Sequence, residues 1–175
     1  MSAGTPMKFD HLGIVVPSLE EGRAHLFAAL HVAEWSREFA DPVNGVFVQF
    51  GRDPLAMCYE LLAPLGDNSP VALALHKGEG ILNHVAYRVE VLEPQVNRLR
   101  DLHFFSLGTP KPAIAYEGRN VQFLMSPLNF IVELIEHPEH EHVFSRLANQ
   151  ASDAFLARQR YPDVHRWSHA VHGDE

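Results

Sequence analysis

The sequence predicts an α+β fold in which two tandem βαβββ modules are followed by a C-terminal helix. The first observation is an internal repeat. After a shift of 73 residues, the stretch from His11 to Leu61 matches the stretch from His84 to Leu134 at 14 of 51 positions, where unrelated stretches of average composition would match at about three. The second observation is that both copies show the same order of strand-like and helix-like segments. The third is an amphipathic segment beyond the repeat.

Each copy begins with a strand that leads into a helix. The apolar run after His11 predicts the first strand. Ser18-Leu-Glu-Glu21 is a capping box, in which the serine and the glutamate side chains bind free backbone amides, and it predicts a helix through about Leu30. In the second copy the helix is expected to start near Leu92, with Pro94 in the first turn, where a missing amide does no harm.

Short β-rich runs bounded by turn residues follow each helix. The clearest runs cover residues 46–50 and 57–62 in the first copy and residues 121–125 and 130–135 in the second. Residues 64–71 link the copies, and a short helical or loop segment is expected over residues 72–77. Each copy is therefore expected to contain one strand, one helix and three further strands.

The last 38 residues lie outside the repeat. Phe144, Ala148, Ala151 and Phe155 recur at helical spacing, which predicts an amphipathic helix from about residue 141 to residue 160. We therefore expect one duplicated domain over residues 1–137, with module one at about 8–64 and module two at about 81–137. A C-terminal helical extension is expected over residues 138–175, with its apolar face on the sheet or on another subunit.

The composition narrows the classes of function. Hydrophobic residues make up 46% of the chain and charged residues 21%, which is normal for a globular protein. With 14 basic and 22 acidic side chains, the net charge of -8 opposes binding to a nucleic acid backbone. No apolar stretch approaches the roughly 20 residues of a membrane helix, and the first residues lack the pattern of a secretory signal. The single cysteine, Cys58, is expected to be a buried small hydrophobe. We expect a cytoplasmic protein that acts on a small molecule.

Two pairs of residues suited to metal binding recur within the repeat. Glu60 follows His11 by 49 residues, and Glu133 follows His84 by the same number. Each histidine lies at the start of a strand, and each glutamate lies in the last strand of its module among apolar neighbours. A carboxylate buried there without a partner would be costly, so two equivalent ones indicate a shared cation.

We therefore predict that His11, Glu60, His84 and Glu133 bind one divalent ion, namely zinc, cobalt, nickel or manganese, with one or two positions open to water or substrate. The alternative is that these residues are vestiges of a duplicated ancestor. The sequence holds 12 histidines, and others have a weaker claim to function. His137, His140 and His142 lie among acidic residues just past the last strand, and we expect solvated turn residues there.

Three stretches carry a resemblance to a known family: residues 11–20 (HLGIVVPSLE), 60–70 (ELLAPLGDNSP) and 78–86 (GEGILNHVA). They resemble the vicinal oxygen chelate superfamily of glyoxalases, bleomycin resistance proteins and dioxygenases, and in particular its methylmalonyl-CoA epimerase-like members. The resemblance covers about residues 8 to 137. It implies that the paired modules form a cupped mixed sheet around a metal, with ligands from the first and last strands of each module. By position these ligands are His11, Glu60, His84 and Glu133.

The resemblance also implies an activity. It suggests a metal-dependent isomerase or epimerase that removes a proton next to a carbonyl, with a CoA thioester as the expected substrate, in a homodimeric protein. Glu133 or Glu60 would relay the proton. The related epimerases use a further glutamate as a second base, for which Asp41 is the nearest substitute in this chain.

Two other interpretations belong to different classes. The first is a small-molecule binding or antibiotic-resistance protein of the glyoxalase fold that has no catalytic activity. The second is an extradiol dioxygenase, whose iron site uses two histidines and one carboxylate, so the additional Glu60 argues against it.

Overall fold

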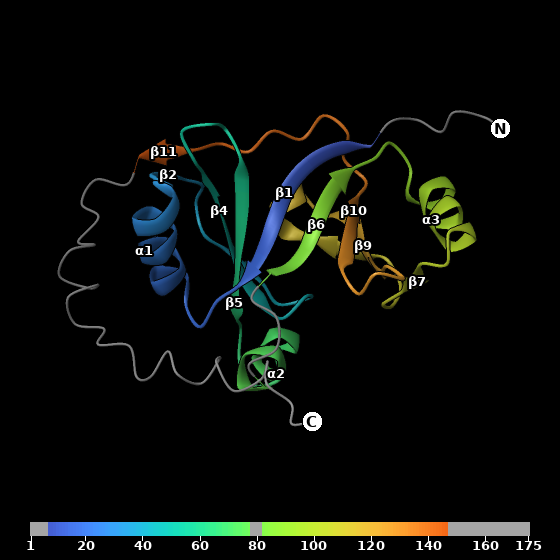
Figure 1. The fold of residues 1–175 in the computed structure, drawn as a ribbon, viewed down its shortest axis with the longest axis horizontal. Helices are drawn as coiled ribbons and strands as arrows, with labels where there is room; N and C mark the ends of the chain where they lie inside the picture. Colours follow the sequence, from blue (N-terminus) through green and yellow to red (C-terminus); the bar gives the residue numbers. More distant parts are fainter. Residues whose placement is uncertain (1–6, 78–81, 147–175) are drawn as a thin grey trace, which may run out of the picture.

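The computed structural model describes residues 7–77 and 82–146 (Figure 1). The first repeat contains β1 (Lys8–Val15), α1 (Leu19–Leu30), β2 (Glu34–Trp35), β3 (Phe39–Asp41), β4 (Val46–Arg52) and β5 (Cys58–Pro64), and α2 (Pro70–Lys77) follows it. The second repeat contains β6 (Leu82–Arg88), α3 (Leu92–Asp101), β7 (Phe105–Ser106), β8 (Lys111–Ala113), the 3-10 helix η1 (Ile114–Tyr116), β9 (Arg119–Met125) and β10 (Ile131–Ile135). A last short strand, β11, covers Ser145–Arg146.

Local sequence signals place both main helices as predicted. Ser18 is the N-cap of α1, and its hydroxyl accepts a hydrogen bond of 3.2 Å from the backbone amide of Glu21. The helix ends where His31 adopts the left-handed conformation, with φ 58°. α3 begins at Leu92 with Pro94 in its first turn, as the sequence indicates.

The strands of the described chain form one mixed sheet with an internal two-fold order. The strand order is β11-β2-β4-β5-β1-β6-β10-β9-β7, with β3 and β8 paired to β4 and β9. β1 pairs with β6 in antiparallel fashion, and each of these two strands has the last strand of its own repeat, β5 or β10, as a parallel neighbour. The four strands that carry the predicted ligands are therefore adjacent at the centre of the sheet.

The sheet curves, and its two halves share a core. Val48 and Phe50 of β4 belong to the same buried cluster as Val121 of β9, although four strands separate β4 from β9. α1 packs with Trp35 and Leu61 on the first repeat, and α3 packs against the strands of the second repeat on the opposite side of the molecule (Figure 1). This arrangement confirms the α+β prediction of two βαβββ modules in a cupped mixed sheet. No helix in the described ranges is long and apolar enough to span a membrane.

Each repeat has four strands after its helix where the sequence predicted three, and the sequence did not locate the short ones. β2, β3, β7 and β8 span two or three residues each, too few for a periodic pattern to show. Cys58, by contrast, is buried in β5 as predicted, and burial raises the pKa of its thiol to about 12.

The prediction of a helix from residue 141 is wrong for the part of it that the structure describes. Residues 141–144 are not helical, and Ser145–Arg146 pair as β11 with Trp35 and Glu34 of β2. Phe144 lies under the guanidinium of Arg52, with Cζ 4.7 Å from the ring centre. This residue is therefore held by the first repeat and not by a helix of its own. The remainder of the expected helix lies outside the described residues, and the domain boundaries stay a prediction.

Candidate metal centre

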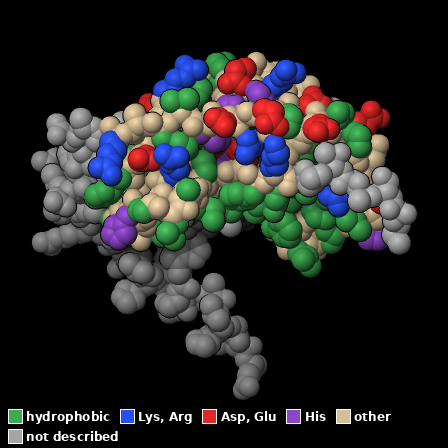
Figure 2. Space-filling view, turned by 90° about the horizontal axis from the view of Figure 1, so that it is seen from above, with side chains coloured by type: hydrophobic (Ala, Val, Ile, Leu, Met, Phe, Trp, Pro, Cys, Tyr) green, Lys and Arg blue, Asp and Glu red, His purple; other side chains and the backbone are tan. Residues whose placement is uncertain are grey.

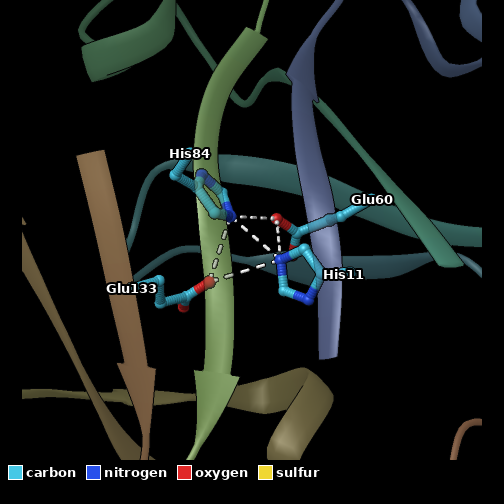
Figure 3. A group of neighbouring side chains, drawn as sticks. All are labelled: His11, Glu60, His84 and Glu133. Atoms are coloured by element: carbon cyan, nitrogen blue, oxygen red, sulfur yellow. Dashed lines mark hydrogen bonds and ion pairs between the residues drawn. The ribbon is translucent and has the colours of Figure 1, made fainter. Parts of the chain in front are cut away.

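The structure brings the four repeat-related side chains together at the centre of the sheet. His11 comes from β1, Glu60 from β5, His84 from β6 and Glu133 from β10 (Figure 3). All four residues are buried. Residues 49 positions apart meet because β1 and β5, like β6 and β10, are parallel neighbours, and the β1–β6 pair joins the two halves.

Their donor atoms face one point. The Nε2 atoms of His11 and His84 are 2.9 Å apart. Glu60 Oε2 lies 3.1 Å from both of these nitrogens, and Glu133 Oε2 lies 3.3 Å from that of His11 and 3.0 Å from that of His84. Ligand atoms about 2.1 Å from a tetrahedral ion are about 3.4 Å apart. The four donor atoms would therefore have to move apart only slightly to coordinate such an ion.

Gly13 makes room for this arrangement. It lies opposite both Glu60 and His84 in the strand pairing. A Cβ atom at position 13 would overlap the imidazole ring of His84. The glycine in the His-Leu-Gly motif therefore lets the second histidine pack directly against the strand of the first.

A network around Asp10 orients His11. Asp10 Oδ2 lies 2.9 Å from Nδ1 of His11, accepts a 2.8 Å hydrogen bond from the Tyr116 hydroxyl, and lies 2.9 Å from Nε2 of His142. Arg88 Nε is 2.9 Å from the other carboxylate oxygen. Because an ionised carboxylate only accepts hydrogen bonds, it fixes the proton of a neutral His11 on Nδ1 and leaves the lone pair of Nε2 directed at the cluster.

The two buried carboxylates of the cluster require compensating positive charge. Burial lowers the pKa of both imidazoles, but Glu60 raises the pKa of His11 well above its ordinary value, and Glu133 does the same, less strongly, for His84. Burial likewise opposes ionisation of Glu60, yet the two histidines bring the pKa of Glu60 below its usual range. Two buried carboxylates need two positive charges, which either two protons or one divalent cation can supply.

The unpaired oxygens fit a cation. Within the described residues, Oε2 of Glu60 and Oε2 of Glu133 are buried atoms without a hydrogen-bond partner, a costly state that metal coordination relieves. Two imidazole nitrogens and two carboxylate oxygens are ligands that zinc, cobalt, nickel and manganese accept. The residues present therefore fit a divalent ion.

A cavity of about 280 Å³ opens next to the two glutamates. Most of its wall is apolar, with contributions from Val46, Val48, Leu62, Val71, Val121, Phe123 and Ile131. The polar groups in the wall are few and include Glu60, Glu133, Tyr116 and Lys111. Apolar walls with a few convergent polar groups are typical of a small-molecule site.

Asp41 lies in the wall of the same cavity but outside the four-residue cluster. It is buried in β3, and its carboxylate accepts hydrogen bonds from the backbone amide and side-chain amide of Asn44 and from the backbone amide of Ile114. These bonds tie the first repeat to the second and hold the carboxylate in one orientation.

The expectation of solvated turn residues is wrong for two of the three late histidines. The side chains of His140 and His142 are only 7% and 10% exposed. His142 stacks on Phe50, with ring centres 4.0 Å apart, while its Nε2 meets Asp10. The acidic residues near them in the sequence suggested that these histidines are exposed to solvent. They are buried because the chain after β10 folds back and brings residue 142 next to residue 10. The contacts of Tyr116 and His142 with Asp10 were missed for the same reason, since they join residues 106 and 132 positions apart. The contact of Asp10 with His11 joins sequence neighbours and was overlooked.

Comparisons with known proteins agree with this architecture. The family described as the Glyoxalase/Bleomycin resistance protein/Dioxygenase superfamily matches residues 10–123. The chain is 35% identical over 130 residues to an ethylmalonyl-CoA/methylmalonyl-CoA epimerase of Cereibacter sphaeroides, a match that covers 74% of this chain and 95% of the relative. It is also 31% identical over 121 residues to the human mitochondrial methylmalonyl-CoA epimerase, covering 67% of this chain and 65% of the relative.

Solved structures share the fold. A hypothetical protein of Bacillus halodurans C-125 superposes with a TM-score of 0.67 at 25% identity and covers 79% of this chain and 100% of its own. Methylmalonyl-CoA epimerase of Mycobacterium tuberculosis superposes with a TM-score of 0.64 at 24% identity, over 78% of this chain and 93% of its own. The curved sheet of paired modules is thus common to all of them.

Proposed function

Because this chain belongs to the Glyoxalase/Bleomycin resistance protein/Dioxygenase superfamily, we propose that it is a metal-dependent epimerase acting on an acyl-CoA thioester, next to the thioester carbonyl. The observation that carries the proposal is a pair of buried carboxylates, Glu60 and Glu133, which meet two imidazoles and also line a mostly apolar cavity. Epimerases for ethylmalonyl-CoA and methylmalonyl-CoA are among the relatives more than 30% identical to this chain.

In this proposal His11, Glu60, His84 and Glu133 hold one divalent ion, with zinc, cobalt, nickel and manganese as the candidates. Such an ion supplies a Lewis acid that stabilises the negative charge developing on the thioester oxygen when the α-proton leaves. Asp10 keeps Nε2 of His11 free to coordinate, and Gly13 keeps the ring of His84 close to β1.

Epimerisation needs a proton to leave one face of the α-carbon and another to arrive on the opposite face. Glu133, or Glu60 in its place, takes the proton on a carboxylate oxygen at the cavity wall. Asp41 is the second group, since it lines the same cavity and its orientation is fixed by Asn44 and Ile114. The apolar wall excludes water from the α-carbon, and the Lys111 ammonium offers a partner for an anionic group of the substrate.

The test is exchange of the α-proton. Protein loaded with a divalent ion is incubated with methylmalonyl-CoA in deuterium oxide, and loss of the α-proton signal is followed by nuclear magnetic resonance. We expect exchange with the native protein, loss of at least a hundredfold in rate with Glu133→Gln, and a smaller loss with Asp41→Asn. Glu20→Gln, on the exposed side of α1, serves as the matched control.

Failure of exchange in protein that holds its metal would contradict the epimerase proposal. Tight binding of the thioester without exchange would then favour the alternative of a binding or resistance protein that uses the same cavity. The homodimer and the cytoplasmic location remain predictions.

A further inference from the structure

A second group of metal-ligating side chains lies apart from the four-residue cluster, among the described residues. Glu117 follows η1, and His137 and His140 lie in the turn after β10. Glu117 Oε2 is 2.9 Å from Nε2 of His137 and 3.4 Å from Nδ1 of His140, and the three ligand atoms all lie within 4.8 Å of one another. We call these three residues the Glu117 cluster.

Backbone geometry presents this cluster to solvent on one side. The amide of His140 donates to the carbonyl of His137 at 3.2 Å, and this turn brings the two rings to a centre distance of 5.2 Å. Side-chain exposure falls from 65% at Glu117 through 26% at His137 to 7% at His140. On the face seen from above in Figure 2, histidine side chains lie among acidic and basic ones. An ion bound here could complete its coordination with water.

The buried side of the cluster is held rigidly. Arg88 donates a hydrogen bond to the backbone carbonyl of His140. The ring of Tyr116 packs edge-on against the ring of His140, with centres 4.6 Å apart. A ligand held in place before binding loses little conformational freedom when the ion arrives.

Hydrogen-bond directions leave a lone pair unsatisfied. The Asp10 carboxylate can only accept, so His142 Nε2, 2.9 Å away, carries a proton. A neutral His142 then has its lone pair on Nδ1, which lies 3.3 Å from Nε2 of His140. This lone pair accepts a hydrogen bond from a proton on Nε2 of His140. His140 is thereby left with a bare Nδ1 directed at Glu117 Oε2, which is also an acceptor.

A cation between these two acceptors would satisfy both of them. A hydrogen bond from the far ring nitrogen to a fixed partner is also the usual support of a metal-binding histidine. The route His140–His142–Asp10 ends on His11, so the same chain of side chains orients ligands at both clusters.

We propose that Glu117, His137 and His140 form a second metal site, which binds a divalent transition metal such as zinc with water as the remaining ligand. Two histidines and one carboxylate with an open position are a common zinc ligand set. The site is separate from the cavity that the epimerase proposal uses, since none of its three residues lines the wall beside Glu60 and Glu133.

Zinc stoichiometry tests this proposal. Full-length protein is stripped with a chelator, titrated with zinc in a calorimeter, and analysed for metal after desalting. We expect two equivalents for the native chain and one for His137→Ala or Glu117→Gln, both of which alter partly exposed side chains and leave the fold intact. His76→Ala, an exposed histidine of α2, is the matched control and should retain two.

Zinc binding at the four-residue cluster is tested separately with His84→Ala. His84→Ala should lose the other equivalent and retain the one held by the Glu117 cluster. A native chain that binds a single equivalent, or a second equivalent that persists in both His137→Ala and Glu117→Gln, would overturn the proposal. Loss of zinc in His84→Ala but not in His137→Ala supports the epimerase metal centre alone, so the two proposals fail independently.

Discussion

At the scale of single residues, Asp10 orients a candidate ligand, His11, without being one of the four itself. Burial opposes its ionisation, but hydrogen bonds with His11 and His142 outweigh burial and hold the pKa of Asp10 well below its ordinary value. The carboxylate is therefore ionised at neutral pH and accepts hydrogen bonds. It thereby selects which nitrogen of a neutral His11 carries the proton and which one faces Glu60 and Glu133.

The substitution Asp10→Asn should weaken metal binding. The side-chain amide that it introduces could donate to His11 Nδ1 and turn the lone pair away from the cluster, so we expect zinc affinity at the four-residue cluster to fall by about 10- to 100-fold. Competition against a coloured chelator measures this change in the His137→Ala background. Asp67→Asn, at an exposed position between β5 and α2, is the control and should leave affinity unchanged. Equal affinity in both variants would rule out an orienting role for Asp10.

At the scale of elements, the pairing of β1 with β6 decides whether two half-sites become one. Each repeat alone brings one histidine next to one glutamate, through a parallel strand pair. Only the antiparallel β1–β6 contact places Nε2 of His84 within 2.9 Å of Nε2 of His11. The contact is close because position 13 has no side chain.

A methyl group at position 13 should therefore disturb the site more than it disturbs the fold. In Gly13→Ala the added Cβ overlaps the His84 ring, which must move away, at a cost of about 1–3 kcal/mol in stability. We expect zinc affinity to fall at least tenfold, as measured by calorimetry alongside thermal unfolding.

The repeat supplies a matched control for this change. Ala86 occupies the equivalent position in β6 and is fully buried. Ala86→Gly removes a methyl group from the core without crowding a ligand, so it should lower stability and leave zinc affinity unchanged. If both variants lost stability and neither lost affinity, the close approach of His84 to β1 would have no bearing on metal binding.

At the scale of the whole molecule, the four-residue cluster joins both repeats across the centre of the sheet. An ion that binds only the folded chain stabilises it by about 2.7 kcal/mol at a concentration of a hundred dissociation constants. Since the ligands come from four strands of both halves, the whole cooperative unit should respond. Without the ion, protons on the two imidazoles must balance the charge of the buried carboxylates.

Removal of metal should therefore lower the unfolding temperature. We expect zinc at saturation to raise the midpoint by roughly 5–10 °C relative to chelator-treated protein. Scanning calorimetry of the His137→Ala background isolates the four-residue cluster. Comparing each protein with and without zinc cancels the intrinsic cost of a substitution, so His84→Ala should show little shift and His76→Ala a full one. An equal shift in both variants would place the stabilising ion elsewhere.

Much of this organisation follows from the sequence. The repeat identified the equivalent strands and the ligand pairs, since a shift of 73 residues aligns His11 with His84 and Glu60 with Glu133. Capping at Ser18 and the apolar runs located the helices and the longer strands because these signals are local. The two-residue strands escaped prediction because they exist only through their pairing partners.

The sequence by itself determined that two βαβββ modules follow one another and that four potential ligands occupy equivalent places in them. Tertiary structure alone decided that the four meet at one point, through the β1–β6 pair, and that the segment after β10 turns back over the sheet. That return brings His142 to Asp10 and seats His140 beside Glu117. It has no counterpart in the repeat, because contacts between residues 132 positions apart depend on where the folded chain arrives and not on any local pattern.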